Sequence, residues 1–222
     1  MLDDLELACF AVGPFVQNVY VLVGSSGKRA ALFDPGFGIE EVLAFLDRRG
    51  LGLDLIVNTH GHIDHVAGNH LVKERTGARL AIHPADIPYL RNLAAQAAAF
   101  GFDVPSSPEP DIALEDGVPL VFDGVEIGVI HTPGHTPGGT CLAFGGRMIV
   151  GDTLFEGGVG RTDLPGGDWD VLVASIREKL FRLPPEVVCY PGHGPETTLG
   201  RERLTNPFVS DAAVGGREKE RS

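Results

Sequence analysis

The sequence predicts an α/β (α+β) fold in which two β-sheets pack face to face and helices cover their outer faces. Each half of the chain runs from segments with strand patterns into segments with helical patterns. This layout suits a two-sheet sandwich, because each sheet buries one face against the other sheet and one against helices. With 222 residues the chain is long enough for one large core, and we expect a single domain over residues 1–209.

The first half begins with strands and continues with alternating helices and strands. The first three strands, with a turn at Gly24-Ser25-Ser26-Gly27, have the pattern of an antiparallel meander. Glycines at 50, 77 and 101 mark the expected helix ends. The expected strands are 5–12, 16–23, 30–33, 53–57 and 79–82, and the expected helices are 39–49, 66–75 and 86–100.

The second half returns to strands and then to helices. Asp123-Gly124 and Gly145-Gly146 are turn sequences between apolar runs, so two hairpins are expected, 119–122 with 125–130 and 140–144 with 148–150. A helix over 168–181 capped by Asp168, a strand over 187–190 and a helix over 196–204 follow. Residues 210–222 have little apolar content and are predicted to be a disordered C-terminal tail.

Charge and hydropathy exclude several classes of partner. The formal net charge of −12 disfavours binding to nucleic acid or to an anionic membrane surface, because both are polyanions. The N-terminus lacks the basic stretch and apolar run of a signal peptide, and no segment offers the ~18 consecutive apolar residues of a membrane span. A cytoplasmic protein is therefore expected. Nothing in the sequence indicates its oligomeric state.

The cysteines do not form a recognisable pair or cluster. Cys9, Cys141 and Cys189 lie far apart in the sequence and each stands among apolar residues. Neither a disulfide framework nor a thiolate zinc site is indicated. We expect all three to be buried strand residues.

Three histidines and an aspartate gather between His60 and His65. By composition, such a window would arise by chance in fewer than about one chain in a thousand. On an extended loop, residues two apart point the same way, so His60 and His62 can converge on one cation while Asp64 and His65 reach a second. Imidazole and carboxylate ligands suit Zn²⁺, Fe²⁺ or Mn²⁺.

Three further candidate ligands follow apolar strands in glycine- and proline-rich turns. They are His135, Asp152 and His193. Loops at strand ends are common places for functional sites. His131 competes with His135 on spacing alone, whereas surface or core roles are expected for His70 and His83. Asp34 is either a partner that orients a ligating histidine or a simple turn residue.

This ordered set resembles the metallo-β-lactamase superfamily, from about the first strand to the last helix. The motif is His-x-His-x-Asp-His, a later His, a Gly-Asp and a final Gly-His. The segments 151–155 and 160–168 resemble the short glyoxalase II-like, or hydroxyacylglutathione hydrolase-like, hydrolases. The resemblance implies an αββα sandwich of two mixed β-sheets flanked by helices.

The resemblance also implies a ligand set for two divalent metal ions. His60, His62 and His135 would bind the first ion, Asp64, His65 and His193 the second, and Asp152 would bridge them. We expect Zn²⁺. Fe and Mn remain alternatives, because the metal bound by a His/Asp site depends on metal availability as much as on affinity.

The expected reaction is hydrolysis of a thioester of a small molecule. Paired cations would generate a bridging hydroxide as nucleophile at neutral pH, and Asp64 would orient the water or pass on its proton. Similarity to glyoxalase II implies a substrate such as S-lactoylglutathione. Arg161, in the Gly-rich segment after Asp152, is the candidate for binding a substrate carboxylate, with a structural loop role as the alternative.

Other activities of this fold remain open. Long glyoxalase II enzymes carry a C-terminal helical domain that grips glutathione, whereas fewer than thirty residues follow His193 here, so glutathione is one option for the acyl carrier. A persulfide dioxygenase would hold a single iron through His60, His135 and Asp152. A non-catalytic metal-binding protein is a further alternative, while lactamase activity and nucleic-acid processing are not favoured.

Overall fold

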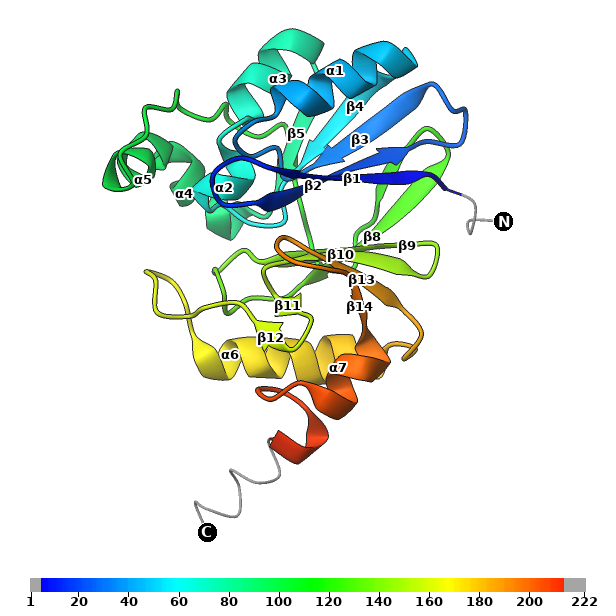
Figure 1. Ribbon diagram of the computed structural model, residues 1–222, viewed down its shortest axis with the longest axis vertical. Coiled ribbons are helices and arrows are strands. Elements are labelled where there is room, and N and C mark those ends of the chain that lie inside the picture. The colour runs from blue at the N-terminus through cyan, green and yellow to red at the C-terminus, as the bar shows by residue number, and fades with distance from the viewer. Residues whose placement is uncertain (1–4, 214–222) are drawn as a thin grey trace.

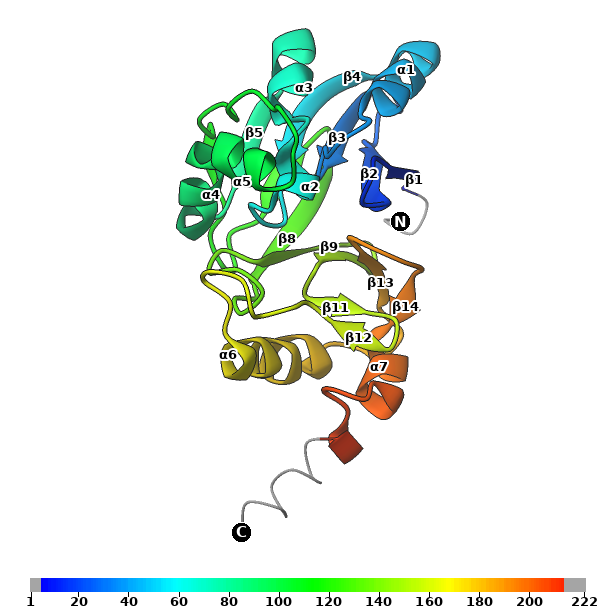
Figure 2. The same ribbon diagram turned by 60° about the vertical axis from the view of Figure 1, so that its left-hand side comes forward.

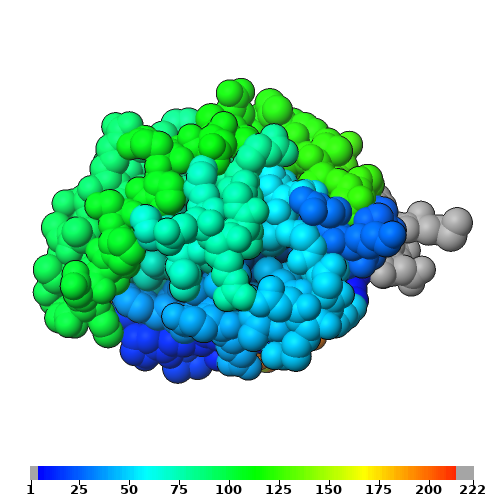
Figure 3. Space-filling view, turned by 90° about the horizontal axis from the view of Figure 1, so that it is seen from above, coloured from blue at the N-terminus to red at the C-terminus, as the bar shows by residue number. Residues whose placement is uncertain are grey.

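Two six-stranded β-sheets lie face to face in the computed structural model, which describes residues 5–213, and helices cover the outer face of each sheet (Figure 1). A view turned by 60° shows the same order of layers, helix, sheet, sheet and helix (Figure 2). From above, the surface is built by the blue to green first half of the chain, in which α1 and α3 cover the upper sheet (Figure 3). The predicted fold class is confirmed.

The strands are β1 Leu7–Val12, β2 Gln17–Val23, β3 Arg29–Phe33, β4 Gly52–Val57, β5 Arg79–Ile82, β6 Ile112–Ala113, β7 Leu120–Phe122, β8 Val125–His131, β9 Thr140–Phe144, β10 Arg147–Gly151, β11 Leu154–Phe155, β12 Gly158–Val159, β13 Val188–Pro191 and β14 Thr197–Thr198. The helices are α1 Glu40–Arg49, α2 Ile63–Val66, α3 Asn69–Thr76, α4 Ile87–Arg91, α5 Leu93–Ala99, α6 Trp169–Ala174 and α7 Leu199–Thr205. Short turns of helix are the 3₁₀ segments η1 Pro84–Asp86 and η3 Leu180–Arg182 and the π-helical segment η2 Ser175–Lys179.

Both large sheets are mixed. The first has the order β1-β2-β3-β4-β5-β6, in which β1 to β3 form the predicted antiparallel meander and β3 to β6 are parallel. The second has the order β14-β13-β10-β9-β8-β7, and only its β10–β13 pair is parallel. Because parallel strands end at the same edge of a sheet, the loops after β3, β4 and β5 gather on one side, as do those after β10 and β13.

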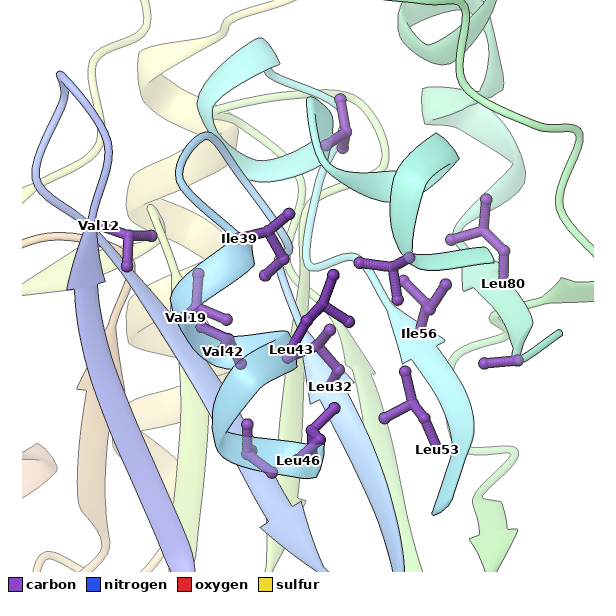
Figure 4. Close-up of a cluster of buried hydrophobic side chains, with 14 of the residues drawn as sticks. Val12, Val19, Leu32, Ile39, Val42, Leu43, Leu46, Leu53, Ile56 and Leu80 are labelled. Atoms are coloured by element: carbon purple, nitrogen blue, oxygen red, sulfur yellow. The ribbon is translucent and has the colours of Figure 1, made fainter. Parts of the chain in front are cut away.

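Three apolar clusters fill the spaces between the layers. Alternation along β2 shows how they arise: Val19 and Val21 point toward α1, whereas Tyr20 and Leu22 point into the space between the sheets. Figure 4 shows the outer cluster, in which α1 side chains such as Leu43 lie against the sheet. The third cluster lies between the second sheet and α6, η2 and α7. Loops at the sheet edges therefore rest on a rigid scaffold.

Two predicted helices are interrupted. The helix expected over 66–75 is α3, which begins only at Asn69, and a separate helix α2 precedes it. Gly68 lies between these two helices. Its N–H donates to Pro35 O, and a Cβ at this position would lie 2.7 Å from Gly36 O. The helix expected over 86–100 is divided into η1, α4 and α5, with a break at Asn92, whose φ of −97° and ψ of 13° leave the α-helical range.

The last two helices also differ in part. Asp168 caps α6 as predicted, since its side chain accepts from Val171 N, but the helix continues as a π-helical and then a 3₁₀ turn. The helix expected over 196–204 begins at Leu199, because the preceding two residues form β14 and Thr198 then caps α7. The short strands β6, β11, β12 and β14 were not predicted, since two residues carry no periodicity.

The predicted tail lies largely outside the described residues. Of its described part, Ser210 is buried, and Asp211 forms ion pairs with Arg177 and Arg203. The chain therefore remains packed beyond the predicted boundary at residue 209.

The cysteines divide into two environments. Cys141 and Cys189 are buried, as expected. The prediction for Cys9 is right about the strand and wrong about burial: Cys9 lies in β1, but its side chain is exposed, because β1 is an edge strand of the first sheet.

Candidate metal centre

Loops from both sheets bring the predicted ligands together between the layers. His60 and His62 follow β4, and α2 carries Asp64 and His65. The other three ligands come from the second sheet, from the loops after β8, β10 and β13. They are His135, Asp152 and His193. The prediction of one extended loop for the whole motif is wrong in its second half, since His62 is extended (φ −71°, ψ 149°) and Asp64 and His65 are helical.

The ligand atoms form two triads. One potential ligand atom from each of His60, His62 and His135 lies within 4.8 Å of the others, and the same holds for Asp64, His65 and His193. These are the groupings that the resemblance implied for the first and second metal. Within them, His62 Nδ1 lies 2.9 Å from His135 Nε2, and His193 Nε2 lies 3.0 Å from Asp64 Oδ2.

Asp152 lies between the triads. Its carboxylate oxygens are 3.4 Å from His65 Nε2, 3.7 Å from His135 Nε2 and 3.8 Å from His193 Nε2. It also forms a third compact group with His60 and His65, one histidine from each triad. A single carboxylate thus faces imidazoles of both groups, as a bridging ligand would.

Three buried ligand atoms have no hydrogen-bond partner among the described residues. They are His60 Nε2, His65 Nε2 and Asp152 Oδ1. An unpaired polar atom in the interior costs about 1–3 kcal/mol, so buried polar groups are normally satisfied. These atoms come from residues that form one compact group, and a divalent cation would satisfy all of them at once. The donor set therefore fits bound metal.

Charge at the site favours a cation. Burial lowers the pKa of His60 well below its ordinary value and that of His62 to about 4, so both rings are neutral with lone pairs available. Burial acts to raise the pKa of Asp64 and Asp152, but His65 and the other neighbouring histidines together outweigh it, and both carboxyls have a lowered pKa. Neutral imidazoles and ionised carboxylates are the forms that bind metal ions.

The pKa of His65 also indicates that positive charge is favoured at this site. Burial acts to lower its pKa, yet the carboxylates of Asp152, Asp64 and Asp34 raise it well above the ordinary value. A cation beside His65 Nε2 would supply the charge that these three carboxylates favour.

A layer of partners outside the triads orients the ligands. Asp34 Oδ2 lies 3.0 Å from His65 Nδ1 and also accepts from Thr59 Oγ1, which lies 3.1 Å from His60 Nδ1. Of the two roles that the sequence left open for Asp34, the structure shows contact with a candidate ligand, although the residue also has the turn-like φ of 53°. His135 Nδ1 lies 2.7 Å from Arg161 O. Contacts of this kind fix ring orientation and tautomer.

The remaining histidines lie apart from the triads. The His131 ring stacks on His83 with centroids 4.0 Å apart, and its Nε2 lies 2.9 Å from Pro137 O. His70 is exposed on α3 near Glu74. The geometry therefore favours His135 over His131 as a ligand.

Arg161 makes two separate contacts, one through its backbone and one through its side chain. Its carbonyl faces His135, whereas its guanidinium forms a bidentate pair with Asp163, and both side chains are exposed. Asp163 therefore holds the guanidinium at the surface.

Two residues that contact the loops or rings of the first triad were not predicted from the sequence. Asp86, expected only as a helix start, is fully buried and accepts from Gly61 N and Gly138 N, in the loops that carry the first triad. Tyr89 packs against the His62 ring, with centroids 5.5 Å apart, and its hydroxyl donates to Pro165 O. Neither has a local signal, because their partners are distant in sequence.

Known relatives cover nearly the whole chain. Hydroxyacylglutathione hydrolase GloC of Haemophilus influenzae is 34% identical over 210 residues, which cover 93% of this chain and 99% of that protein. A protein crystallised in a di-iron-bound form is 39% identical, with a TM-score of 0.83 and coverage of 91% of this chain and all of that one.

Two further solved structures are also similar to this chain. The B3 metallo-beta-lactamase BLEG-1 has a TM-score of 0.86 and 33% identity, covering 92% of this chain and 99% of its own. ETHE1 from Myxococcus xanthus has a TM-score of 0.78 and 25% identity, covering 92% of this chain and 84% of its own. The family model of the metallo-beta-lactamase superfamily matches residues 12–193, a range that spans all seven candidate ligands. The chain therefore belongs to the metallo-beta-lactamase superfamily.

Proposed function

We propose that this protein is a metal-dependent hydrolase that cleaves a thioester of a small molecule, such as S-lactoylglutathione. The observation that carries the proposal is the pair of ligand triads facing one carboxylate, Asp152. A structural zinc site is normally a closed set of four ligands, so two adjoining triads favour catalysis over a purely structural role. His60, His62 and His135 would hold one ion, Asp64, His65 and His193 the other, and Asp152 both.

Metals bound there would lower the pKa of water and polarise a substrate carbonyl. The remaining steps belong to the chain's own groups. Asp64 is only partly buried, and its Oδ2 lies 3.0 Å from His193 Nε2. We assign its other oxygen to orienting the attacking water or accepting its proton. Asp34 and Thr59 would hold His65 and His60 in place while charge develops.

The thioester assignment is supported by one relative and by the sequence. GloC, which matches over nearly its full length, is named a hydroxyacylglutathione hydrolase. The segment after Asp152 has the sequence that resembles glyoxalase II-like enzymes. No helix in the described part of the chain is long and apolar enough to cross a membrane.

A persulfide dioxygenase is the second candidate. It would need one iron held by His60, His135 and Asp152, and His135 Nε2 does lie 3.7 Å from Asp152 Oδ2. The intact second triad favours hydrolysis, because a single-iron enzyme has no use for Asp64, His65 and His193 as ligands.

Metal content and parallel assays test the proposal. The purified protein is analysed for Zn, Fe and Mn, then assayed for S-lactoylglutathione hydrolysis, glutathione-persulfide-dependent O₂ uptake and β-lactam hydrolysis. We expect about two metal ions per chain and thioester hydrolysis, lost on chelation and restored by metal. His193→Ala should remove one ion and most activity, whereas His131→Ala, a histidine outside the triads, should retain both. One iron with O₂ uptake, or β-lactam cleavage alone, would overturn the assignment.

A further inference from the structure

Asp86 is a buried carboxylate that belongs to neither triad. It lies in η1, directly after β5, and its side chain is fully buried. Among the described residues, its hydrogen-bond donors are two backbone N–H groups and a hydroxyl, none of them a cation. Burying a carboxylate is costly unless hydrogen bonds compensate, so its three donors define what the residue does.

Those donors come from both loops of the first triad. Asp86 Oδ2 accepts from Gly61 N at 2.9 Å and from Thr136 Oγ1 at 2.8 Å, while Oδ1 accepts from Gly138 N at 2.6 Å. Gly61 stands between His60 and His62, and Thr136 directly follows His135. One carboxylate thus ties the loop after β4 to the loop after β8, although these loops belong to different sheets.

The glycines make this close approach possible. A Cβ on Gly138 would lie 2.7 Å from the Asp86 carboxylate, and one on Gly61 would lie 3.1 Å from the Asp86 carbonyl oxygen. Real Cβ atoms essentially never come as close as the first of these distances. Side chains at these positions would force the N–H donors away from the carboxylate.

We propose that Asp86 is a positioning residue that sets the separation of the two ligand loops and thereby the geometry of the first metal triad. His62 Nδ1 and His135 Nε2, only 2.9 Å apart, come from the two loops that Asp86 joins. The second triad contains no residue from the 135–138 loop and has its own partner in Asp34. Loss of Asp86 should therefore weaken one metal site selectively. The inference rests on the proposed metal centre.

Asp86→Asn is the test variant, because it keeps the shape but replaces one acceptor oxygen by a donor. Glu202→Gln is the matched control. Glu202 is also fully buried and accepts three hydrogen bonds, from Gly157 N, Thr197 Oγ1 and Asn206 Nδ2, but it lies in α7 away from the triads. Thr136→Val removes a single donor and serves as a milder variant should Asp86→Asn fold poorly.

The measurement is Zn²⁺ binding to the metal-free full chain, in competition with a chromophoric chelator. In the wild type we expect two binding steps. Asp86→Asn should weaken one step about 10- to 100-fold, the usual cost of losing a partner outside the ligand shell, and leave the other within about threefold. Thr136→Val should shift the same step less, and Glu202→Gln should lower thermal stability without changing either step.

The outcomes separate this inference from the proposed function. If the wild type binds two ions and Asp86→Asn binds both unchanged, the positioning role is wrong, whatever the enzyme hydrolyses. Equal weakening of both steps, or the same loss in Glu202→Gln, would also overturn it. If the wild type binds no metal, the proposed function fails first. Thioester assays play no part in the comparison.

Discussion

His65 is flanked by carboxylates on both of its ring nitrogens. Nδ1 lies 3.0 Å from Asp34 Oδ2, and Nε2 lies 3.4 Å from Asp152 Oδ1. The first contact fixes the ring, and the second joins it to Asp152, the carboxylate that faces both triads. Three candidate ligands, His60, His65 and His135, thus have a partner on the far side of the ring, and for His135 this partner is Arg161 O.

We predict that substitution of Arg161 affects substrate binding and leaves metal binding unchanged. Arg161→Ala removes the guanidinium but keeps the backbone carbonyl that contacts His135. The variant should therefore keep its bound metal and change only in substrate binding. We expect the KM for an anionic thioester to rise by up to about fivefold, because exposed ion pairs contribute up to about 1 kcal/mol. A neutral thioester should be affected less. Steady-state kinetics with both substrates checks this.

Asp163→Asn is the companion variant. It frees the guanidinium from its bidentate partner, so the KM for the anionic thioester should fall or stay the same. Equal changes in KM for both substrates in Arg161→Ala would leave the guanidinium with only a structural role.

Glycine-rich turns after the strands determine how closely the elements approach at the site. Gly192 follows β13, and a Cβ there would overlap Asp152 Oδ1 and lie 2.5 Å from His65 Cε1. Gly194, two residues later, has open space around it but a φ of +76°. The first glycine is required for space and the second for backbone conformation.

The two glycines should therefore respond differently to substitution by alanine. Gly192→Ala should weaken metal binding by at least about tenfold, because it displaces Asp152 and His65, two candidate ligands. Gly194→Ala should cost about 1 kcal/mol of folding free energy, since left-handed backbone disfavours a Cβ, and should bind metal normally. Metal titration and thermal unfolding of both variants distinguish the effects. Normal metal binding by Gly192→Ala would contradict the close packing.

Three apolar clusters hold the two sheets and their helices together. The reactivity of the cysteines depends on whether they are buried in these clusters. Cys141 and Cys189 lie in the cluster beneath the second sheet, whereas Cys9 is exposed at the edge of the first. Burial raises the pKa of Cys141 from its ordinary value of 9.0 to about 11. Buried neutral thiols are unreactive toward disulfide reagents.

We therefore predict that one of the three thiols reacts with Ellman's reagent in the native protein and all three react in guanidinium chloride. The raised pKa also sets a pH dependence. Between pH 9 and about 11 the unfolded Cys141 thiol loses its proton while the folded one keeps it, so the free energy of unfolding decreases as pH rises. Cys141→Ala should show a shallower decrease in denaturant titrations over this range. Three reactive native thiols would contradict the layered packing.

Local patterns in the sequence were sufficient to predict the fold class and to propose a set of candidate metal ligands. Strand alternation, turn dipeptides and glycine stops depend on neighbouring residues, and the His60–His65 motif is dense enough to stand out without a structure. The order of ligands along the chain also matched the family, and the triads that it implied are the groups that the fold brings together. These features required no knowledge of distant contacts.

The way in which those candidate ligands are held depends on contacts between distant parts of the chain. Asp86 reaches Gly138, 52 positions away, and Asp34 reaches His65, 31 positions away, so neither role is visible in a local window. The exposure of Cys9 follows from the position of β1 at a sheet edge. Residue type and spacing were enough to identify the candidate metal ligands, because both can be read without any contact between distant residues. The packing of two sheets decided which carboxylates and carbonyls hold those side chains in place, because such contacts form only when distant loops meet.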